Sequence, residues 1–244
     1  MSTIRAHQRR ARNPKSDRQV VRTPQRTRRH HEQTCSIEET NASLHLYVRR
    51  QGKADFLYLD PPWSYGRQTK NMNHNASPSF HYPVMSNTDL LAFDFGQAAS
   101  RHAMCAMWAP MSQVPLAIQM MHNNGFRYVT AIVWSKTLAS GKAAHCAAPG
   151  AVLPEHELLL IGRRQAGVPI AKGRKRIHGV IRAVRTAHSA KPQLFRTELE
   201  RLFPDNREGE PTRFLELFAR KRARGWRTWG NQAPGRKLVV GIAA

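Results

Sequence analysis

The sequence predicts an α/β fold, in which an open sheet of apolar strands is covered by helices on both faces. Short apolar runs alternate along the chain with amphipathic helical patterns, and prolines, glycines or capping residues separate them. The chain has 244 residues, of which 41% are hydrophobic, so one large domain with a sizeable core is expected. No internal repeat is visible.

Five short apolar segments are predicted to form the strands. They are DFLYLD (55–60), HAMCAMWAP (102–110), YVTAIVWSK (128–136), HELLLIGR (156–163) and RFLELFAR (213–220). Pro110 is expected to close the second of these strands.

Three segments are predicted to form helices. The segment 86–101 opens with Ser86 and Asp89, which have the spacing of a capping box. The segment 112–126 has Pro115 in its first turn and Gly125 after its end. The third helix is expected over 191–204, where Pro192 suits the first position and Pro204 ends the helix. Its apolar face consists of Leu194, Phe195, Leu199, Leu202 and Phe203.

The composition points to a polyanionic partner. The formal net charge is +23, which makes nucleic acid the first expectation and an acidic membrane surface or acidic protein the alternative. No apolar run approaches the roughly 20 residues of a membrane span, so no membrane partner is predicted. Cys35, Cys105 and Cys146 are widely spaced and match neither a zinc site nor a disulfide framework. A cytoplasmic location and no bound metal are therefore predicted.

Two stretches concentrate the positive charge. Residues 1–43 are predicted to form a flexible basic arm before a folded domain over 44–244, because the first 34 residues carry ten Lys and Arg and few large apolar residues. The second stretch, 158–197, contains no acidic residue. Both stretches are candidates for binding phosphates, and a merely solubilising tail or a solvated face is the alternative.

The sequence DPPW at 60–63 is the strongest candidate site. Asp60 follows a buried strand, and ligands of open α/β sheets bind outside the carboxyl ends of the strands. Pro61 and Pro62 have a fixed φ and no N–H, so their carbonyls are expected to be available as acceptors. Trp63 would add a ring on which a base could stack, worth about 1–3 kcal/mol. The alternative is a turn in which Asp60 caps and Trp63 packs.

These groups suit the alkylation of an aromatic exocyclic amine. The N6 lone pair of adenine is delocalised into the ring, so the nitrogen is a poor nucleophile. Acceptors on Asp60 and the Pro61 carbonyl would hold both N–H bonds, favour a tetrahedral nitrogen and stabilise the positive charge that develops on it.

DPPW resembles the signature of the adenine-N6 methyltransferase family typified by the catalytic subunit of the mRNA N6-adenosine methyltransferase. Six further segments are similar to that family in the expected order, and together they cover about residues 54–233. These segments are FHYPVMSNTDL, CAMWAP, YVTAIVWSKT, PEHELLLIGRR, VRTAHSAKP and RFLELFARKRARGWRTWGNQ. The chain looks like a compact bacterial or phage-type member.

The resemblance implies a Rossmann-like methyltransferase sheet with a permuted motif order, in which the catalytic motif comes early and the donor-binding strand late. It implies S-adenosylmethionine as methyl donor and adenine N6 of DNA or RNA as acceptor. The absence of a G-x-G-x-x-G sequence after an early strand agrees with this order.

The resemblance also implies roles for individual residues. Besides the catalytic Asp60, Pro61, Pro62 and Trp63, the donor-binding residues would be Asp60, Lys191, Arg220, Asn231 and Gln232. Among these, Lys191 would meet the donor's carboxylate, Arg220 its ribose, and the two amides its adenosine end. On the acceptor side the candidates are Tyr82, Lys136 and Glu157.

Some points stay open at this stage. The family's early donor-binding acid has no clear match, and Glu38, Glu39 and Asn41 are the candidates. A catalytically inactive nucleic-acid-binding relative and a methyltransferase for cytosine N4 or a protein amide are the alternative functions. Trp63 favours adenine, since enzymes for those other acceptors more often carry Tyr or Phe there. A homodimer or a partner subunit is possible.

Overall fold

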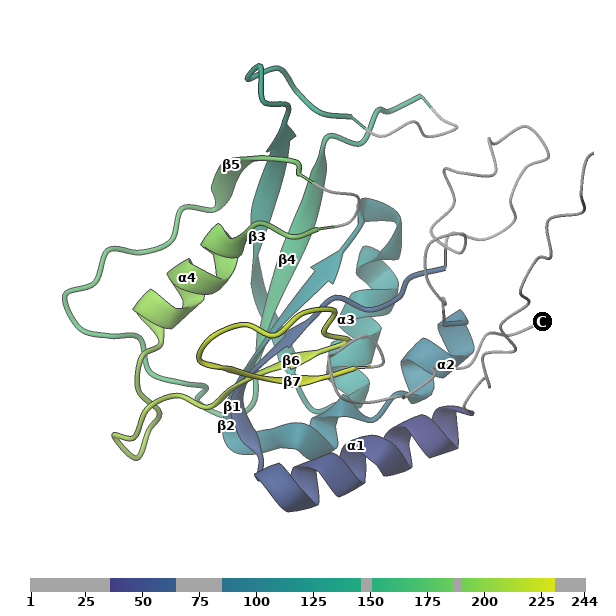
Figure 1. The fold of residues 1–244 in the computed structure, drawn as a ribbon, viewed down its shortest axis with the longest axis vertical. Coiled ribbons are helices and arrows are strands. Elements are labelled where there is room, and N and C mark those ends of the chain that lie inside the picture. The colour runs from purple at the N-terminus through teal and green to yellow at the C-terminus, as the bar shows by residue number, and fades with distance from the viewer. Residues whose placement is uncertain (1–35, 65–84, 146–150, 187–189, 231–244) are drawn as a thin grey trace, which may run out of the picture. The chain divides into compact units, whose positions relative to one another are not determined.

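A computed structural model describes residues 36–64, 85–145, 151–186 and 190–230, which form a seven-stranded sheet flanked by helices (Figure 1). The strands are β1 (Ala54–Leu59), β2 (Ala99–Ala109), β3 (Arg127–Thr137), β4 (His156–Arg163), β5 (Val180–Val184), β6 (Phe214–Leu217) and β7 (Trp226–Trp229). The helices are α1 (Ile37–Gln51), α2 (Asn87–Ala92), α3 (Val114–Asn123) and α4 (Gln193–Leu202), with short 3-10 turns η3 (Phe95–Ala98) and η4 (Met111–Gln113). Within these residues no helix is both long and apolar enough to cross a membrane.

The sheet has the strand order β5-β3-β4-β2-β1-β6-β7 and is mostly parallel. Strand β1 pairs in parallel with β2 and β6, β6 with β7, and β3 with β5, whereas β4 is antiparallel to both neighbours. The carboxyl ends of the six parallel strands and the amino end of β4 therefore share one edge, called the carboxyl edge below. The late strand β6 lies directly beside β1, which is the arrangement that the permuted motif order implies.

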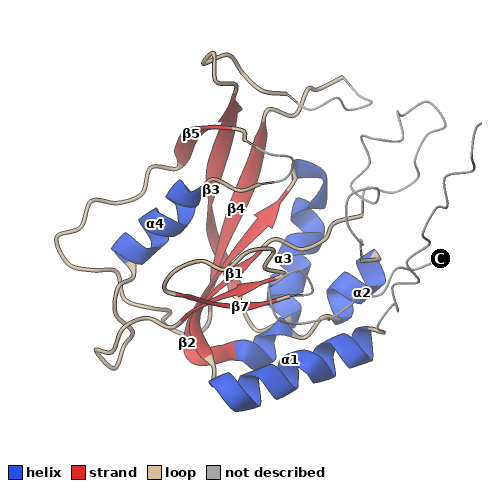
Figure 2. Ribbon diagram, viewed as in Figure 1, coloured by secondary structure: helices blue, strands red, loops and turns tan. Residues whose placement is uncertain are grey.

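Helices cover both faces of the sheet, as predicted (Figure 2). Alternate side chains of β1 point to opposite faces. Leu57 and Leu59 belong to the core beneath α1, α2 and α3, while Phe56 and Tyr58 belong to a second core beneath α4. Strand β1 is buried on both faces, which explains its continuous apolar run.

All five predicted strands form, with small shifts at their ends, and the helix predicted around Pro115 is confirmed as α3. Strands β5 and β7 were not predicted. The segment 86–101 is not one helix, which corrects the prediction. Ser86 caps α2 as expected, but the backbone is extended at Phe93, and Asp94 caps the separate turn η3. From Ala99 the chain joins the sheet beside β1, and this pairing replaces the helix.

The third predicted helix is confirmed as α4, with a correction to its face. Pro192 is its N-cap rather than its first residue. Leu194 is 44% exposed, whereas the remaining members of the predicted apolar face are buried. The helix therefore packs over Phe195 and the residues one and two turns later.

Helix α1 runs across residue 43, where the predicted arm ends. It begins at Ile37, because Ser36 and Glu39 form a capping box that satisfies the first backbone N–H groups. Residues 1–35 lie outside the described residues. Glu39 is thus used in capping, and Asn41 bonds to the backbone of Ala92 and Asp94. These contacts give both residues structural roles, and neither is assigned to the donor.

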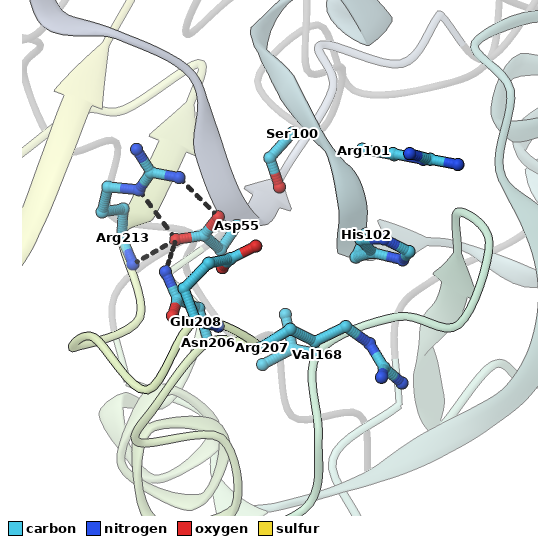
Figure 3. Close-up of a pocket in the computed structure, with 9 residues that line it drawn as sticks. All are labelled: Asp55, Ser100, Arg101, His102, Val168, Asn206, Arg207, Glu208 and Arg213. Atoms are coloured by element: carbon cyan, nitrogen blue, oxygen red, sulfur yellow. Dashed lines mark hydrogen bonds and ion pairs between the residues drawn. The ribbon is translucent and has the colours of Figure 1, made fainter.

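A pocket lies at the opposite, amino edge of the sheet, near the start of β1 (Figure 3). Its central feature is Asp55, which is 3% exposed and accepts hydrogen bonds from the backbone N–H, Nε and Nη2 of Arg213 at 2.8–3.1 Å. These contacts join the start of β1 to the segment before β6. We interpret the pocket as part of a structural tie, since its most buried acid is already paired.

Asp55→Asn should lower the free energy of unfolding by about 2 kcal/mol near neutral pH, because charged hydrogen bonds are lost at a buried site. The Arg213 side chain is half-exposed, so water partly replaces the hydrogen bonds that its guanidinium loses in the variant. Burial would raise the pKa of Asp55, but the hydrogen bonds from Arg213 lower it by more. A lowered pKa stabilises the fold above the ordinary carboxyl pKa, and this stability is lost as the pH falls through the lowered value.

The difference between wild type and Asp55→Asn should therefore shrink in acid, which urea unfolding at about pH 7 and about pH 3 would measure. Glu208→Gln, a change in an exposed carboxylate of the same pocket, is the control and should have little effect. A difference that stays constant over this pH range would contradict the role of the Asp55 charge.

Candidate active site

The DPPW segment forms the turn that leaves β1 at the carboxyl edge. The Pro61 carbonyl accepts a hydrogen bond from the Trp63 N–H at 2.9 Å, and the Pro62 carbonyl accepts one from the Met85 N–H at 3.0 Å. Neither bond belongs to a helix or a sheet ladder, but each uses one lone pair of a carbonyl that is expected to be available as an acceptor. Each oxygen has a second lone pair, so the Pro61 carbonyl can still accept one further bond.

Trp63 is buried rather than available for stacking. Its side chain is 4% exposed and packs in the core beneath α1, α2 and α3. The indole N–H donates to the Trp108 carbonyl at 3.1 Å, which ties the end of β1 to the end of β2. The structure thus gives Trp63 the packing role of the alternative hypothesis, because an indole held in this way presents no free face to a base.

Asp60 belongs to a chain of ion pairs that brings together five predicted site residues. Lys191 Nζ lies 2.9 Å from Asp60 Oδ1 and 3.2 Å from Glu157 Oε2. Lys136 Nζ lies 2.6 Å from Glu157 Oε1. Arg220 approaches the other oxygen of Asp60 at 3.6 Å. The cluster therefore alternates in sign from Arg220 through Asp60, Lys191 and Glu157 to Lys136.

The topology of the sheet explains this assembly. Asp60 follows β1, Arg220 follows β6, and Lys136 is the second-last residue of β3. Glu157 is the second residue of β4, and since β4 is antiparallel, its amino end reaches the same edge. Lys191 comes two residues before α4 and meets the cluster from that side. Five residues spread over the sequence thus meet at the carboxyl edge.

Lys191 and Glu157 keep their charges although little of either side chain is exposed. Burial alone would lower the pKa of Lys191, but the carboxylates of Asp60 and Glu157 raise it by more. Burial alone would raise the pKa of Glu157, but Lys191 and Lys136 lower it by more. Lys191 is therefore an ammonium and Glu157 a carboxylate at neutral pH.

Each lysine of the cluster lies over the ring of a buried tryptophan. Lys191 Nζ lies 5.6 Å from the centre of the Trp108 ring, and Lys136 Nζ lies 5.1 Å from that of Trp134. A cation over an indole face is stabilised by the ring quadrupole. Trp108 and Trp134 contact each other edge to face, so both lysines stand on one aromatic layer.

Glu216 lies beside this site on β6. It lies opposite Tyr58 of β1 in the sheet register and forms an ion pair with Arg196 of α4. Burial raises the pKa of Glu216 by more than Arg196 lowers it. Its second carboxylate oxygen is buried and has no hydrogen-bond donor within the described part of the chain. Arg196, which also lies over the Tyr58 ring, was not predicted as a site neighbour because nothing local distinguishes it from other basic residues.

Three predicted site residues, Tyr82, Asn231 and Gln232, lie outside the described residues. The chain just before the last two is described, and it passes very close to the end of β6. A Cβ on Gly230 would lie 2.7 Å from the Ala219 nitrogen, so only glycine fits there. Phe218 has a φ of 59°, a left-handed backbone that is uncommon for a phenylalanine. The ends of β6 and β7 are therefore held together beside Arg220.

The residues present fit S-adenosylmethionine as a ligand. Its amino-acid end carries an ammonium and a carboxylate, which match a carboxylate and an ammonium held 2.9 Å apart as Asp60 and Lys191. Its ribose carries hydroxyls, and Glu216 has a carboxylate oxygen without a donor among the described residues.

The fold and this site define a Rossmann-like methyltransferase domain. Residues 54–232 match the model of the MT-A70 family, which is most of the chain, and the chain belongs to that family. This confirms the resemblance found in the DPPW segment and its companions.

Two curated proteins are among its relatives. The type II methyltransferase M.MunI of Mycoplasma sp is 26% identical over 204 residues, which cover 77% of this chain and 81% of the relative. A putative N(6)-adenosine-methyltransferase MT-A70-like protein of Medicago truncatula is 26% identical over 196 residues. That match covers 77% of this chain but only 28% of the plant protein.

Proposed function

We propose that the cluster of Asp60, Lys191, Glu157, Lys136 and Arg220 is the active site at which this protein methylates adenine. The protein is an S-adenosylmethionine-dependent methyltransferase for the N6 amino group of adenine in nucleic acid, as its membership of the MT-A70 family and its relatives support. The observation on which the site assignment rests is the 2.9 Å pair of Asp60 and Lys191 at the carboxyl edge.

The donor side consists of Lys191, Asp60 and Arg220. When bound, S-adenosylmethionine supplies an electrophilic methyl group on a sulfonium sulfur. Lys191 is a buried ammonium and suits the donor's carboxylate, while Arg220, 35% exposed, suits its ribose. Asn231 and Gln232 are the proposed partners of the adenosine end. The carboxylate of a bound donor would share the Lys191 ammonium with Asp60, and this sharing would weaken the ion pair between Lys191 and Asp60 Oδ1.

On the acceptor side, Asp60 orients the amino group. Its carboxylate accepts one N6–H bond, and the remaining lone pair of the Pro61 carbonyl accepts the other. Both oxygens oppose the positive charge that develops on nitrogen as the N–C bond forms and the S–C bond breaks. The surplus proton then leaves N6 to water, so no general base is needed. An adenine inside a duplex has to be flipped out to reach Asp60.

Glu157 and Lys136 complete the acceptor side. Lys136 holds one oxygen of Glu157 and Lys191 holds the other, which fixes the carboxylate in one orientation. We assign them to positioning the acceptor nucleotide, together with Tyr82. Trp63 is not assigned to stacking, because it is buried.

Incubating the purified protein with isotopically labelled S-adenosylmethionine and with separate DNA and RNA samples tests the function. Mass spectrometry of the digested nucleosides should find labelled N6-methyladenine in at least one sample. Label in N4-methylcytosine instead would show that the acceptor is cytosine N4 rather than adenine N6. No label in any nucleoside would overturn the proposal. A partner subunit, a homodimer and a cytoplasmic location stay predictions.

A further inference from the structure

Eight of the ten Lys and Arg residues in the acid-free segment 158–197 fall into two groups. One group faces inward and is already paired. Arg164 donates to the Asn124 carbonyl and lies over the Phe126 ring. Arg196 pairs with Glu216, and Lys191 lies in the active site. These residues are structural or catalytic and are not available to a large partner.

The other group faces water. It comprises five side chains, which we call the cationic strip: Lys172, Arg174, Lys175, Arg176 and Arg182. All five are exposed. The ion pairs among the described residues, which include Lys136–Glu157 and Arg201–Glu198, involve none of the five. A strip of five unbalanced positive charges therefore lies on one segment of the surface.

The strip is held in place by apolar residues between its members. Ile177, Ile181 and Ala183 pack against the core beneath α4. Arg201 of α4 donates to the Lys175 carbonyl at 2.8 Å, and the Gly179 carbonyl accepts from Val133 of β3. Figure 1 shows the connection from β4 to β5 running along the outer side of α4. The charges thus project from a fixed support rather than from a free tail.

The strip ends next to the acceptor side of the active site. Strand β5 is an edge strand among the described residues and pairs in parallel with β3. Lys136, which holds Glu157, lies opposite Ala183, the residue that follows Arg182. A polyanion bound along the strip would therefore pass with only β3 between it and Glu157, the carboxylate that we assign to the acceptor.

A charged edge strand can also serve only to prevent edge-to-edge aggregation. That role accounts for Arg182, which stands between the exposed Val180 and Val184 on β5. It does not account for the four cations of residues 172–176, which precede the strand and leave no sheet edge to protect.

We propose that the cationic strip binds the phosphates of duplex DNA that carries the target adenine. Duplex DNA fits better than a single strand, because its two strands place a negative charge at about every 1.7 Å of helix axis, which is dense enough for closely spaced cations each to meet a phosphate. The strip supplies affinity and orientation without reading bases, since its contacts are to the backbone. This inference rests on the proposed function and names the substrate surface of that same site.

The test uses the full chain with all five residues of the strip changed to Gln: K172Q, R174Q, K175Q, R176Q and R182Q. The control variant removes the same charge at the amino edge of the sheet: R49Q, R50Q, K53Q, R101Q and R127Q. These five residues are also exposed and lie on the last turn of α1, just before β1, at the third residue of β2 and at the first residue of β3. Affinity for a mixed-sequence duplex oligonucleotide and for its single strand is measured at several salt concentrations.

The strip variant should bind duplex DNA about tenfold or more weakly at low salt and flatten the slope of log K against log salt by up to about 4.5, at about 0.9 for each phosphate. The control variant should change the slope by less than one unit, and S-adenosylmethionine binding should be unchanged in both. Equal slopes for the strip and control variants would overturn the inference. A strip effect on the single strand alone would overturn the assignment to duplex DNA.

Methylation by the wild-type protein separates this result from the proposed function. If the wild type labels adenine and the strip variant still shows the control slope, only the strip assignment fails. If the wild type labels no nucleoside, the proposed function fails whatever the slopes are.

Discussion

The Asp60→Asn variant should lose about 10²–10³-fold in kcat for methyl transfer. Asn keeps the size of the side chain and one acceptor oxygen but loses the negative charge opposite the nitrogen. No carboxylate then opposes the positive charge that develops on N6. The substitution also removes the ion pair between Asp60 and Lys191, whose atoms lie 2.9 Å apart in the wild type. Single-turnover kinetics with saturating donor measure the chemical step apart from binding.

Asp205→Asn is the matched control, because Asp205 is an exposed carboxylate next to Asn206, which lines the pocket at the amino edge of the sheet. Its rate should equal that of the wild type. Donor affinity in Asp60→Asn should fall much less than kcat. A variant at Asp60 that turned over at the wild-type rate would remove this residue from the mechanism.

Lys191→Met should weaken S-adenosylmethionine binding by about ten- to a hundredfold, which corresponds to the loss of one charged hydrogen bond. Met keeps the apolar stem against Trp108 but cannot meet the donor's carboxylate. The variant also leaves Asp60 and Glu157 without the cation that they share. Calorimetry with the donor alone, together with an unfolding curve, shows whether the loss is one of binding rather than of folding.

Lys136→Met is the comparison for this prediction. Lys136 stands over Trp134 as Lys191 stands over Trp108, and it contacts the same Glu157, but it lies on the acceptor side. Its removal should leave donor affinity within about twofold and raise KM for nucleic acid. Equal losses of donor affinity in both variants would show that the two lysines do not divide the site as proposed.

Much of the site could be predicted because its chemistry is local in the sequence. A buried strand followed at once by Asp60 and two prolines fixes where the carboxylate emerges, whatever the rest of the chain does. The alternation of strands and helices then places Lys136, Glu157 and Arg220 at or near strand ends. Resemblance to the family selected Lys136, Glu157, Lys191 and Arg220 as site residues, and the structure joins them to Asp60 in one chain of ion pairs.

The resemblance to the family supplied the charged site residues other than Asp60. What the sequence by itself determined is therefore the fold class, the strands β1, β2, β3, β4 and β6, and the helices α3 and α4. Each depends on a pattern within one short segment, where periodicity, proline and capping residues suffice.

Only the tertiary structure decided the end of α2, the existence of β5 and β7, the burial of Trp63 and the division of the basic residues. Each of these depends on a partner distant in the sequence. Strand β5 forms on the edge of β3, and Trp63 turns inward because its indole N–H meets the carbonyl of Trp108, 45 residues away. An arginine paired with a buried acid and one facing water look alike in sequence, because the free energy that separates them comes from packing and not from local conformation.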